Sequence, residues 1–366
     1  MNAPTKPLSF PQSVWLVTER ELGSKLRSKS FVISTIILFA IVLAGVLWAG
    51  FTAQNGGDRT AIAVTPETQS AVAGLDESFD VTEAADDDAA RELVADGDVE
   101  VALVPGGGEP FGFVLVGDES VSTSLVQLFS ITPEVELLSP DATDGFLRYL
   151  VAFGFGIVFF AAAFTFGSTI ATSVVEEKQT RVVELLISAI PTRALLAGKV
   201  LGNTILAMGQ VLGIVAIATV GLTLTGQDLI LAGLGGPIAW FAVFFLLGFV
   251  LLAALFAAAG AMVSRQEDIG ATITPLTYLV MAPYFLVIFF NDNPLVLTIM
   301  SYVPFSAPVG MPVRIFVGEA LWWEPIASLV VMVLTCIAAI LVGAKIYENS
   351  ILRMGARVKL AEALRR

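Results

Sequence analysis

Six long apolar runs follow one another along this chain, and each is continuous rather than alternating between apolar and polar residues. A membrane helix needs about 20 apolar residues, because the hydrocarbon core is about 30 Å thick and a helix rises about 1.5 Å per residue. Alternation with a period of two would instead be typical of a barrel strand. We therefore predict six transmembrane helices, at residues 31–53, 146–174, 200–224, 237–263, 269–290 and 325–347.

The first run has the length of a retained span rather than that of a secretory signal peptide. It begins at residue 31, and its apolar core is longer than the roughly 7–15 residues of a signal peptide. We expect it to stay in the protein as the first helix.

The composition agrees with a membrane protein and excludes several kinds of site. The mean hydropathy is +0.82, and only 14% of the residues are charged, which is unusual for a soluble domain. The chain has no histidine, so a His-based metal centre, proton relay or catalytic triad is excluded. Its one cysteine, Cys336, lies inside the sixth run and excludes an intrachain disulfide framework. We expect no metal site and no nucleic-acid partner.

Lysine and arginine are concentrated in one set of loops, and this orients the chain. Sixteen of the 20 basic residues lie before the first run, within 175–199, at Arg265, or in the tail from Lys345 onward, at the end of the last run. Basic residues are enriched in cytoplasmic loops. Both termini and the loop at 175–199 are therefore predicted to be cytoplasmic.

The segment between the first two runs is predicted to be a small extracytoplasmic α/β domain at 54–145. It holds 20 acidic and two basic residues. The stretches TAIAV, FDVTEA, VEVALVP and FGFVLVG have the β-branched and aromatic character of strands. Between the second and third, DDDAARELVADGD predicts a short helix with aspartate at its start and Gly97 at its end. The three aspartates at its start are interpreted as a solvated helix N-terminus.

The segment 291–324 is apolar but interrupted by Pro294, Pro304, Pro308 and Pro312. These prolines prevent one straight helix, and the number of spans requires the segment to begin and end outside. We predict a re-entrant helical hairpin there, with an ion pair between Arg314 and Glu319. A loop that rests on the membrane is the alternative.

The loop SVVEEKQTRVVELLISAIPTRALLAGKV is the densest cluster of charge near the spans. Four apolar residues in it have helical spacing, and Glu177, Arg181 and Glu184 share the opposite side. This pattern predicts one amphipathic helix that ends near Pro191. It could hold the neighbouring spans in register or present charge to a cytoplasmic partner, and periodicity does not decide between the two. The apolar residues are Val183, Leu186, Ile187 and Ile190.

A second amphipathic element precedes the first span and is predicted to lie on the inner leaflet. Trp15, Leu22 and Leu26 can share one face of a helix. The side chains available for anionic headgroups are those of Arg20, Lys25, Arg27 and Lys29.

The spans contain few polar residues that could line a transport path. Buried charge normally marks an ion route, and its scarcity here weakens the assignment of sodium as cargo and leaves hydrophobic or amphipathic cargoes open. Helix packing is the alternative role of these polar residues. The third run also contains Gly198-x-x-x-Gly202 and Gly209-x-x-x-Gly213, which permit close helix approach within one protomer or between two. The polar candidates are Asn203, Gln210, Thr272, Thr274 and Thr277.

Three stretches together resemble the permease subunits of ABC-2 type exporters, most closely the sodium-efflux (NatB-like) subgroup. They are VTERELGSKLRSKSFVIST, VVEEKQTRVVELLISAIPTRALLAGKVLG and PFSAPVGMPVRIFVGEALWWEP. The resemblance covers nearly the whole chain. It implies that the element before the first span is an interfacial elbow, that the helix at 175–199 is a coupling helix, and that the hairpin closes the exit.

The resemblance also implies how such a permease is energised. The chain has no G-x-x-x-x-G-K-[ST] segment, so a P-loop ATPase site is absent from it. ATP and Mg²⁺ would bind to a separate cytoplasmic ATPase subunit, and this chain would need no cofactor of its own. The residues expected to dock on that subunit are Glu176, Glu177, Lys178, Arg181 and Glu184.

The sequence therefore predicts an α-helical integral membrane protein of a bacterial plasma membrane. It would work as a homodimer or as a heterodimer with a related permease, in the lipid bilayer, and would export an ion or a small amphipathic molecule. The competing hypothesis is a membrane-anchored sensor or assembly factor with a ligand-binding ectodomain. The expected division is 1–30 elbow, 31–53 helix 1, 54–145 ectodomain, 146–174 helix 2, 175–199 coupling helix, 200–290 helices 3–5, 291–324 re-entrant segment, 325–347 helix 6 and 348–366 tail.

Overall fold

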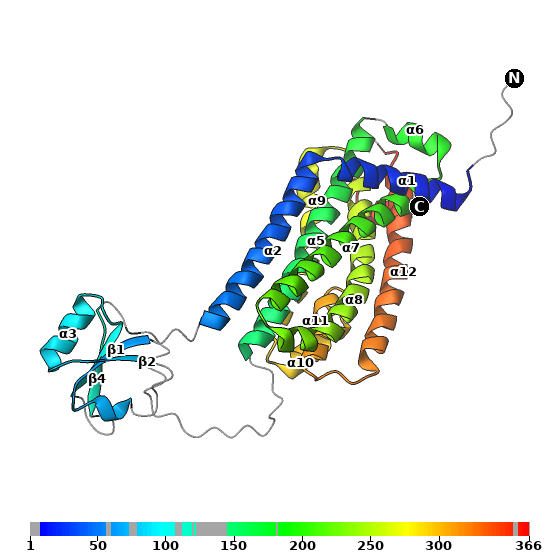
Figure 1. Ribbon diagram of the computed structural model, residues 1–366. Coiled ribbons are helices and arrows are strands. Elements are labelled where there is room, and N and C mark those ends of the chain that lie inside the picture. The colour runs from blue at the N-terminus through cyan, green and yellow to red at the C-terminus, as the bar shows by residue number, and fades with distance from the viewer. Residues whose placement is uncertain are drawn as a thin grey trace. The chain divides into compact units, whose positions relative to one another are not determined.

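A computed structural model describes residues 8–55, 60–72, 79–106, 112–118, 121, 145–180, 182–353 and 358–365. The chain divides into two compact units, Met1–Leu47 with Asp141–Arg366, and Trp48–Pro140. The first is a bundle of helices and the second contains a β-sheet (Figure 1).

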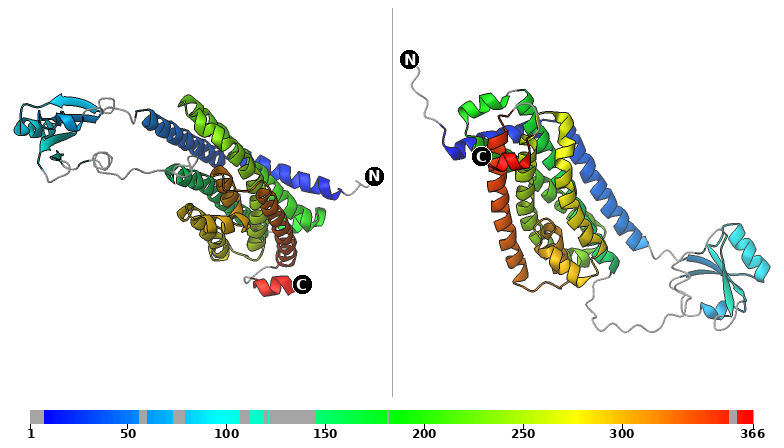
Figure 2. Two further views of the ribbon diagram at one scale, coloured as in Figure 1. Left: turned by 90° about the horizontal axis from the view of Figure 1, so that it is seen from below. Right: turned by 180° about the vertical axis from the view of Figure 1, so that it is seen from behind.

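The helices of the larger unit begin and end close to the apolar runs. In chain order they are α1 (Phe10–Leu26), α2 (Lys29–Asn55, whose end lies past the unit boundary), α5 (Gly145–Gln179), α6 (Val182–Ala189), α7 (Thr192–Leu224), α8 (Asp228–Ala261), η2 (Gln266–Asp268), α9 (Ile269–Phe289), α10 (Pro294–Tyr302), α11 (Ala307–Phe316), α12 (Glu324–Ser350) and α13 (Leu360–Arg365). We call the end of the bundle with α1, α6 and α13 the α6 end, and the end with α10 and α11 the hairpin end (Figures 1 and 2).

Six of the described helices are long and apolar enough to cross a membrane. They correspond one by one to the six predicted runs, and the protein is therefore a multi-pass membrane protein. With 35 and 33 residues, α5 and α7 are each about 50 Å long, which exceeds the hydrocarbon core by about 20 Å. The membrane-crossing segments are Lys29–Phe51, Leu147–Gln179, Thr192–Leu224, Gly233–Ala261, Gln266–Phe289 and Glu324–Ser350.

Helix α8 lies at the centre of the bundle and packs against α5, α7, α11 and α12. Two glycines permit its closest contacts. A Cβ atom on Gly260 would lie 2.7 Å from the Ala171 carbonyl oxygen of α5, and one on Gly343 of α12 would lie 3.1 Å from the Ala254 oxygen of α8. Small residues at these crossings let the backbones touch, which is how helices associate in lipid.

Helix α7 supports α1 and α2 within the same protomer. A Cβ on Gly198 would lie 2.5 Å from the Val17 Cβ, and one on Gly202 would lie 2.9 Å from the Glu21 Cβ, both on α1. Gly213 of α7 similarly faces Phe39 of α2. The first glycine motif therefore packs helices of one chain, which was one of its two predicted roles.

The proline-interrupted stretch before the last span forms two short helices, α10 and α11. With nine and ten residues, neither can cross a bilayer. Asn293 caps α10 by accepting hydrogen bonds from the amides of Leu295 and Val296. Gly310 of α11 lies against the backbone of Met300 in α10, so the two helices form a tight hairpin that packs on α8.

The smaller unit contains one four-stranded sheet with the order β2-β1-β3-β4. The first three strands are parallel, and β3 pairs with β4 in antiparallel orientation. Helix α3 (Asp87–Ala95) follows β2; the Asp86 side chain caps it, and Gly97 with φ 78° follows it. The predicted strands and helix are thus present. The strands are β1 (Thr60–Val64), β2 (Phe79–Glu83), β3 (Val101–Pro105) and β4 (Phe113–Val116), with η1 (Gln69–Ala71) between the first two.

Candidate functional site

The charged loop between the second and third spans is not one amphipathic helix. Glu176, Glu177 and Lys178 belong to the last turns of α5, and a new helix, α6, begins at Val182. The break follows Thr180, whose hydroxyl donates to the Glu176 carbonyl at 2.8 Å and so competes for the backbone of the helix end. Arg181 lies outside the described residues.

Helix α6 presents one face to the bundle and the other to its surroundings. Val183 and Ile190, which directly follows the helix, are buried, as their spacing predicts, and Leu186 and Ile187 are half-buried. The opposite face carries Leu185, which is 74% exposed. The other exposed residues of α6 are Val182, Glu184, Ser188 and Ala189. Of the predicted docking residues, only Glu184 lies on this helix.

Glu177 belongs to a group of four charges, which we call the quartet: Arg20, Glu21, Glu177 and Lys199. The Lys199 ammonium lies 2.9 Å from the Oε1 atom of Glu21 and 2.9 Å from that of Glu177. The Arg20 guanidinium contacts the same two carboxylate oxygens. Lys199 also donates to the Ser173 hydroxyl at 2.6 Å. The quartet joins α1, α5 and α7 and has no net charge.

Because the quartet is largely buried, its charges strongly affect one another's pKa values. The Lys199 side chain is 0% exposed and that of Glu21 is 7% exposed. Burial by itself raises the pKa of the Glu21 carboxyl, but Lys199 and Arg20 offset it and hold that pKa below its ordinary value. Burial likewise lowers the pKa of Arg20, and the two carboxylates more than reverse this. Glu21 and Arg20 are thus held in their charged forms.

Lys178 is also internal, which contradicts its expected role on a docking surface. Its side chain is fully buried, and the ammonium donates to the carbonyls of Ala261 at 2.8 Å and Ser350 at 2.9 Å. These are the last residues of α8 and α12. Terminal carbonyls lack partners within their own helix and carry partial negative charge. Lys178 therefore caps two helices at once.

Of the three predicted docking residues at the end of α5, Glu176 is the exposed one. Its carboxylate accepts a hydrogen bond from Gln266 at 3.1 Å. Nearby in sequence, Arg193 at the start of α7 pairs with Glu348 of α12 at 2.7 Å. The surface around α6 thus remains charged, although Glu177 and Lys178 do not contribute to it.

Helix α1 faces the bundle with a mixture of apolar and polar residues. Ser13, Val17, Thr18 and Glu21 are buried, whereas Trp15 is 57% exposed. Leu26 is also exposed, as an interfacial helix requires. The guanidinium of Arg20 contacts Glu21 and Glu177 in the quartet, while its side chain is 38% exposed, so its predicted role at the headgroups stays a prediction. Lys25, Arg27 and Lys29 have no ion pair among the described residues.

The predicted polar path residues do not gather around a common cavity in this conformation. The hydroxyls of Thr272, Thr274 and Thr277 donate to backbone carbonyls one turn earlier, those of Asp268, Gly270 and Ile273. Asn203 is buried on α7 and donates to the Lys199 carbonyl, while its own oxygen has no partner among the described atoms. Gln210, also on α7, is half-buried.

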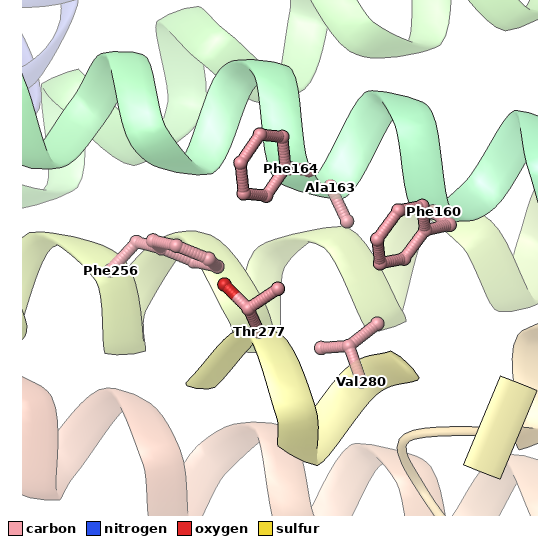
Figure 3. A pocket seen from close by; sticks show the side chains of 6 residues that line it. All are labelled: Phe160, Ala163, Phe164, Phe256, Thr277 and Val280. Carbon is pink, nitrogen blue, oxygen red and sulfur yellow. The ribbon is translucent and has the colours of Figure 1, made fainter. Parts of the chain in front are cut away.

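One of these residues, Thr277, lines a small pocket between α5, α8 and α9. The other lining side chains are apolar (Figure 3), and the cavity volume is about 10 Å³. A cavity of this size holds no more than about one water molecule. The bundle is therefore closed at this point. The apolar lining consists of Phe160, Ala163, Phe164, Phe256 and Val280.

At the hairpin end, Arg314 has a different carboxylate partner from the one predicted. It forms a bidentate pair with Glu324, at 2.9 Å from Oε2 and 3.1 Å from Oε1. It reaches only the backbone carbonyl of Glu319, at 3.1 Å, and the Glu319 carboxylate lies 4.0 Å from Arg148. The chain turns between α11 and α12 so that Glu324, at the start of α12, faces the guanidinium. Sequence spacing alone could not show whether Arg314 pairs with Glu319, five residues later, or with Glu324, ten residues later.

Comparison with known proteins identifies the family. The model of the ABC-2 family transporter proteins matches residues 29–345. A Bacillus subtilis protein, the uncharacterized protein YhaP, is 26% identical over 93% of this chain and 95% of its own length. The uncharacterized protein MJ1024 of Methanocaldococcus jannaschii is 26% identical over 57% of this chain and 51% of its own length. No solved structure matches the chain.

The family match includes the six membrane-crossing helices, the inserted sheet unit, α6 and the hairpin. Membrane domains of this family generally pair with a cytoplasmic ABC ATPase. The six apolar helices agree with that membrane role. This chain belongs to the ABC-2 family of transporter proteins.

Proposed function

We propose that this protein is the permease subunit of an ATP-driven exporter and that α6 docks on a separate ATPase subunit. The observation that carries the proposal is the exposed face of α6. Leu185, Glu184 and Ser188 project from a short helix whose other face is buried, at the end of two helices long enough to extend beyond the bilayer. An exposed leucine beside charge is a suitable anchor for a protein partner.

In this proposal α6 is the cytoplasmic coupling element, and both termini lie on its side of the membrane. The proposed contact residues differ from those expected from sequence: Glu176 and Glu184 remain, and Leu185 and Ser188 join them. Glu177 and Lys178 support the docking surface from inside. ATP and Mg²⁺ would bind to the partner subunit, and closure of that subunit would displace α6 together with the ends of α5 and α7.

The cargo proposed is a small amphipathic molecule rather than sodium. Sodium requires several oxygen ligands that converge, whereas the threonine hydroxyls of α9 are bound to their own helix. The described residues contain no group of three or more acidic or cysteine side chains able to hold a metal ion. The exporter would work in a bacterial plasma membrane, as a homodimer or as a heterodimer with a related permease.

Copurification from a bacterial host that carries the chain and its neighbouring genes tests the docking. The tagged chain is compared with Glu184→Lys/Leu185→Asp and with Leu352→Asp, which alters a similarly exposed leucine after α12. We expect a P-loop ATPase to be retained by the unaltered chain and by Leu352→Asp, and to be lost from the α6 variant. Retention of the ATPase by the α6 variant would contradict the docking surface. The absence of any P-loop ATPase from all three would contradict the function.

The competing function, a membrane-anchored sensor, is distinguished by removing the sheet unit. The family match favours the permease, because it includes the helices as well as the insertion. A chain in which residues 60–121 are replaced by a short flexible linker should still bind the ATPase if it is a permease. A sensor would lose its response to an external ligand and would need no ATPase.

A further inference from the structure

The quartet connects α1 to the two helices that hold α6. Arg20 and Glu21 lie on α1, Glu177 lies near the end of α5, and Lys199 lies near the start of α7. Only two residues separate α5 from α6, and two separate α6 from α7. A displacement of α6 therefore moves the segments that carry Glu177 and Lys199.

The pairing within the quartet is shared rather than exclusive. The Oε1 atom of Glu177 and that of Glu21 each contact both cations. The Oε2 atom of Glu177 is buried and has no hydrogen-bond partner among the described atoms. Each cation thus has two carboxylates within reach, and one acceptor is free. The partners can be exchanged during a movement without leaving a buried charge unpaired, which would be costly.

We propose that the quartet is the joint through which movement of α6 is passed to α1, and that Lys199 and Glu177 are positioning residues in this joint. The inference rests on the proposed function, because the ATPase has to move α6. Two residues separate α1 from helix α2, the first span. The joint therefore extends the movement from the second and third spans to the first. An ionic network with more than one arrangement is a physical element able to carry such coupling.

Pulsed electron spin resonance on the full complex tests this transmission. Spin labels are placed on exposed residues in a Cys336→Ser background: Glu19 of α1, Ser188 of α6, and Ile337 of α12 as the reference. The distances from Glu19 and from Ser188 to Ile337 are measured without nucleotide and after trapping with ATP, Mg²⁺ and vanadate. We expect both distances to change in the otherwise unaltered chain. With Lys199→Met, the Ser188 change should persist and the Glu19 change should be lost.

Two control variants separate transmission from folding. Lys199→Arg keeps the cation and should preserve both changes. If Lys199→Met does not give a stable complex, the exchanged pair Glu21→Lys/Lys199→Glu takes its place, and it should restore the Glu19 change relative to Glu21→Lys alone. Persistence of the Glu19 change in Lys199→Met, or failure of the exchanged pair to restore it, would overturn the inference.

The failure of this inference is distinguishable from the failure of the proposed function. If Ser188 moves on trapping while Glu19 stays fixed in the unaltered chain, the quartet is not a joint but the permease role stands. If no ATPase binds, or if Ser188 does not move while the bound ATPase is trapped, the proposed function is overturned and the inference falls with it.

Discussion

The Arg314 guanidinium and the Glu324 carboxylate form a buried bidentate pair, 2.9 Å apart at the closest atoms. Arg314 also reaches Ser301 of α10 at 3.1 Å, and Tyr302 donates to Glu324 at 3.2 Å. The pair thus ties both helices of the hairpin to the start of α12. A bidentate arginine pair fixes orientation as well as distance.

Removing one partner of this pair should strongly destabilise the protein. Glu324→Gln or Arg314→Met leaves a buried charge without its counterion, and we expect a loss of about 3–5 kcal/mol in the free energy of unfolding. Unfolding by denaturant in detergent measures it. Arg353→Met, which breaks the more exposed pair with Glu362, should cost less than about 1 kcal/mol. Equal effects at the two sites would contradict the account of the hairpin end.

Lys178→Met should loosen the ends of α8 and α12. The substitution keeps the length of the side chain but removes the donor to two buried carbonyls, and buried acceptors that lose a partner cost about 1–3 kcal/mol. Thermal unfolding of the purified variant measures the effect, with Lys345→Met, at an exposed position on α12, as the control. A variant as stable as the control would show that Lys178 is not a cap.

The close packing of α1 on α7 can be tested by adding one methyl group, in a glycine-to-alanine substitution. In Gly198→Ala the new Cβ would lie 2.8 Å from the Val14 carbonyl oxygen and 2.5 Å from Val17, so α1 has to shift. Overpacking of this kind costs about 1–3 kcal/mol. Gly209→Ala on the same helix meets nothing within 4 Å and should be neutral or slightly stabilising. Thermal unfolding should therefore show that Gly198→Ala lowers the melting temperature, whereas Gly209→Ala leaves it unchanged or raises it slightly.

The quartet should also make stability depend on pH. The pKa of Glu21 is lower in the folded protein than its ordinary value of 4.5, so its stabilising effect is complete above that value. It is lost as the pH falls through the lower, folded-state pKa. The stability difference between the unaltered chain and Glu21→Gln should be constant from about pH 6 to 8 and shrink below about pH 4.5. A difference that grows on acidification would contradict the assigned charge state.

The sequence was sufficient for the six spans and the four strands, but not for the break between α5 and α6 or for the roles of single charges. Apolar runs locate spans because every residue in a span adds to the signal, and the four strands of the sheet unit had the same kind of local pattern. Glu177 and Lys178 were misread because adjacent residues on a helix point in different directions, and their partners lie in α1, α7, α8 and α12.

A weaker signal for the quartet was present. Lys199 directly precedes the third apolar run, Glu177 closely follows the second, and Arg20-Glu21 lies just before the first. Charges at corresponding ends of three spans lie at a similar depth in the membrane, and their signs cancel. Such a pattern indicates that they can pair, but the contacts depend on how the helices pack.

Photo-crosslinking from position 185 in living cells tests the central claim most directly. Leu185 is replaced by a photoreactive phenylalanine analogue, and Leu352 by the same residue as the control. We predict that illumination joins residue 185, but not residue 352, to a protein with a P-loop ATPase sequence, and that the adduct is lost with Glu184→Lys. No adduct at residue 185, or an adduct only with proteins that lack a P-loop, would contradict the proposal that α6 couples this chain to an ATPase.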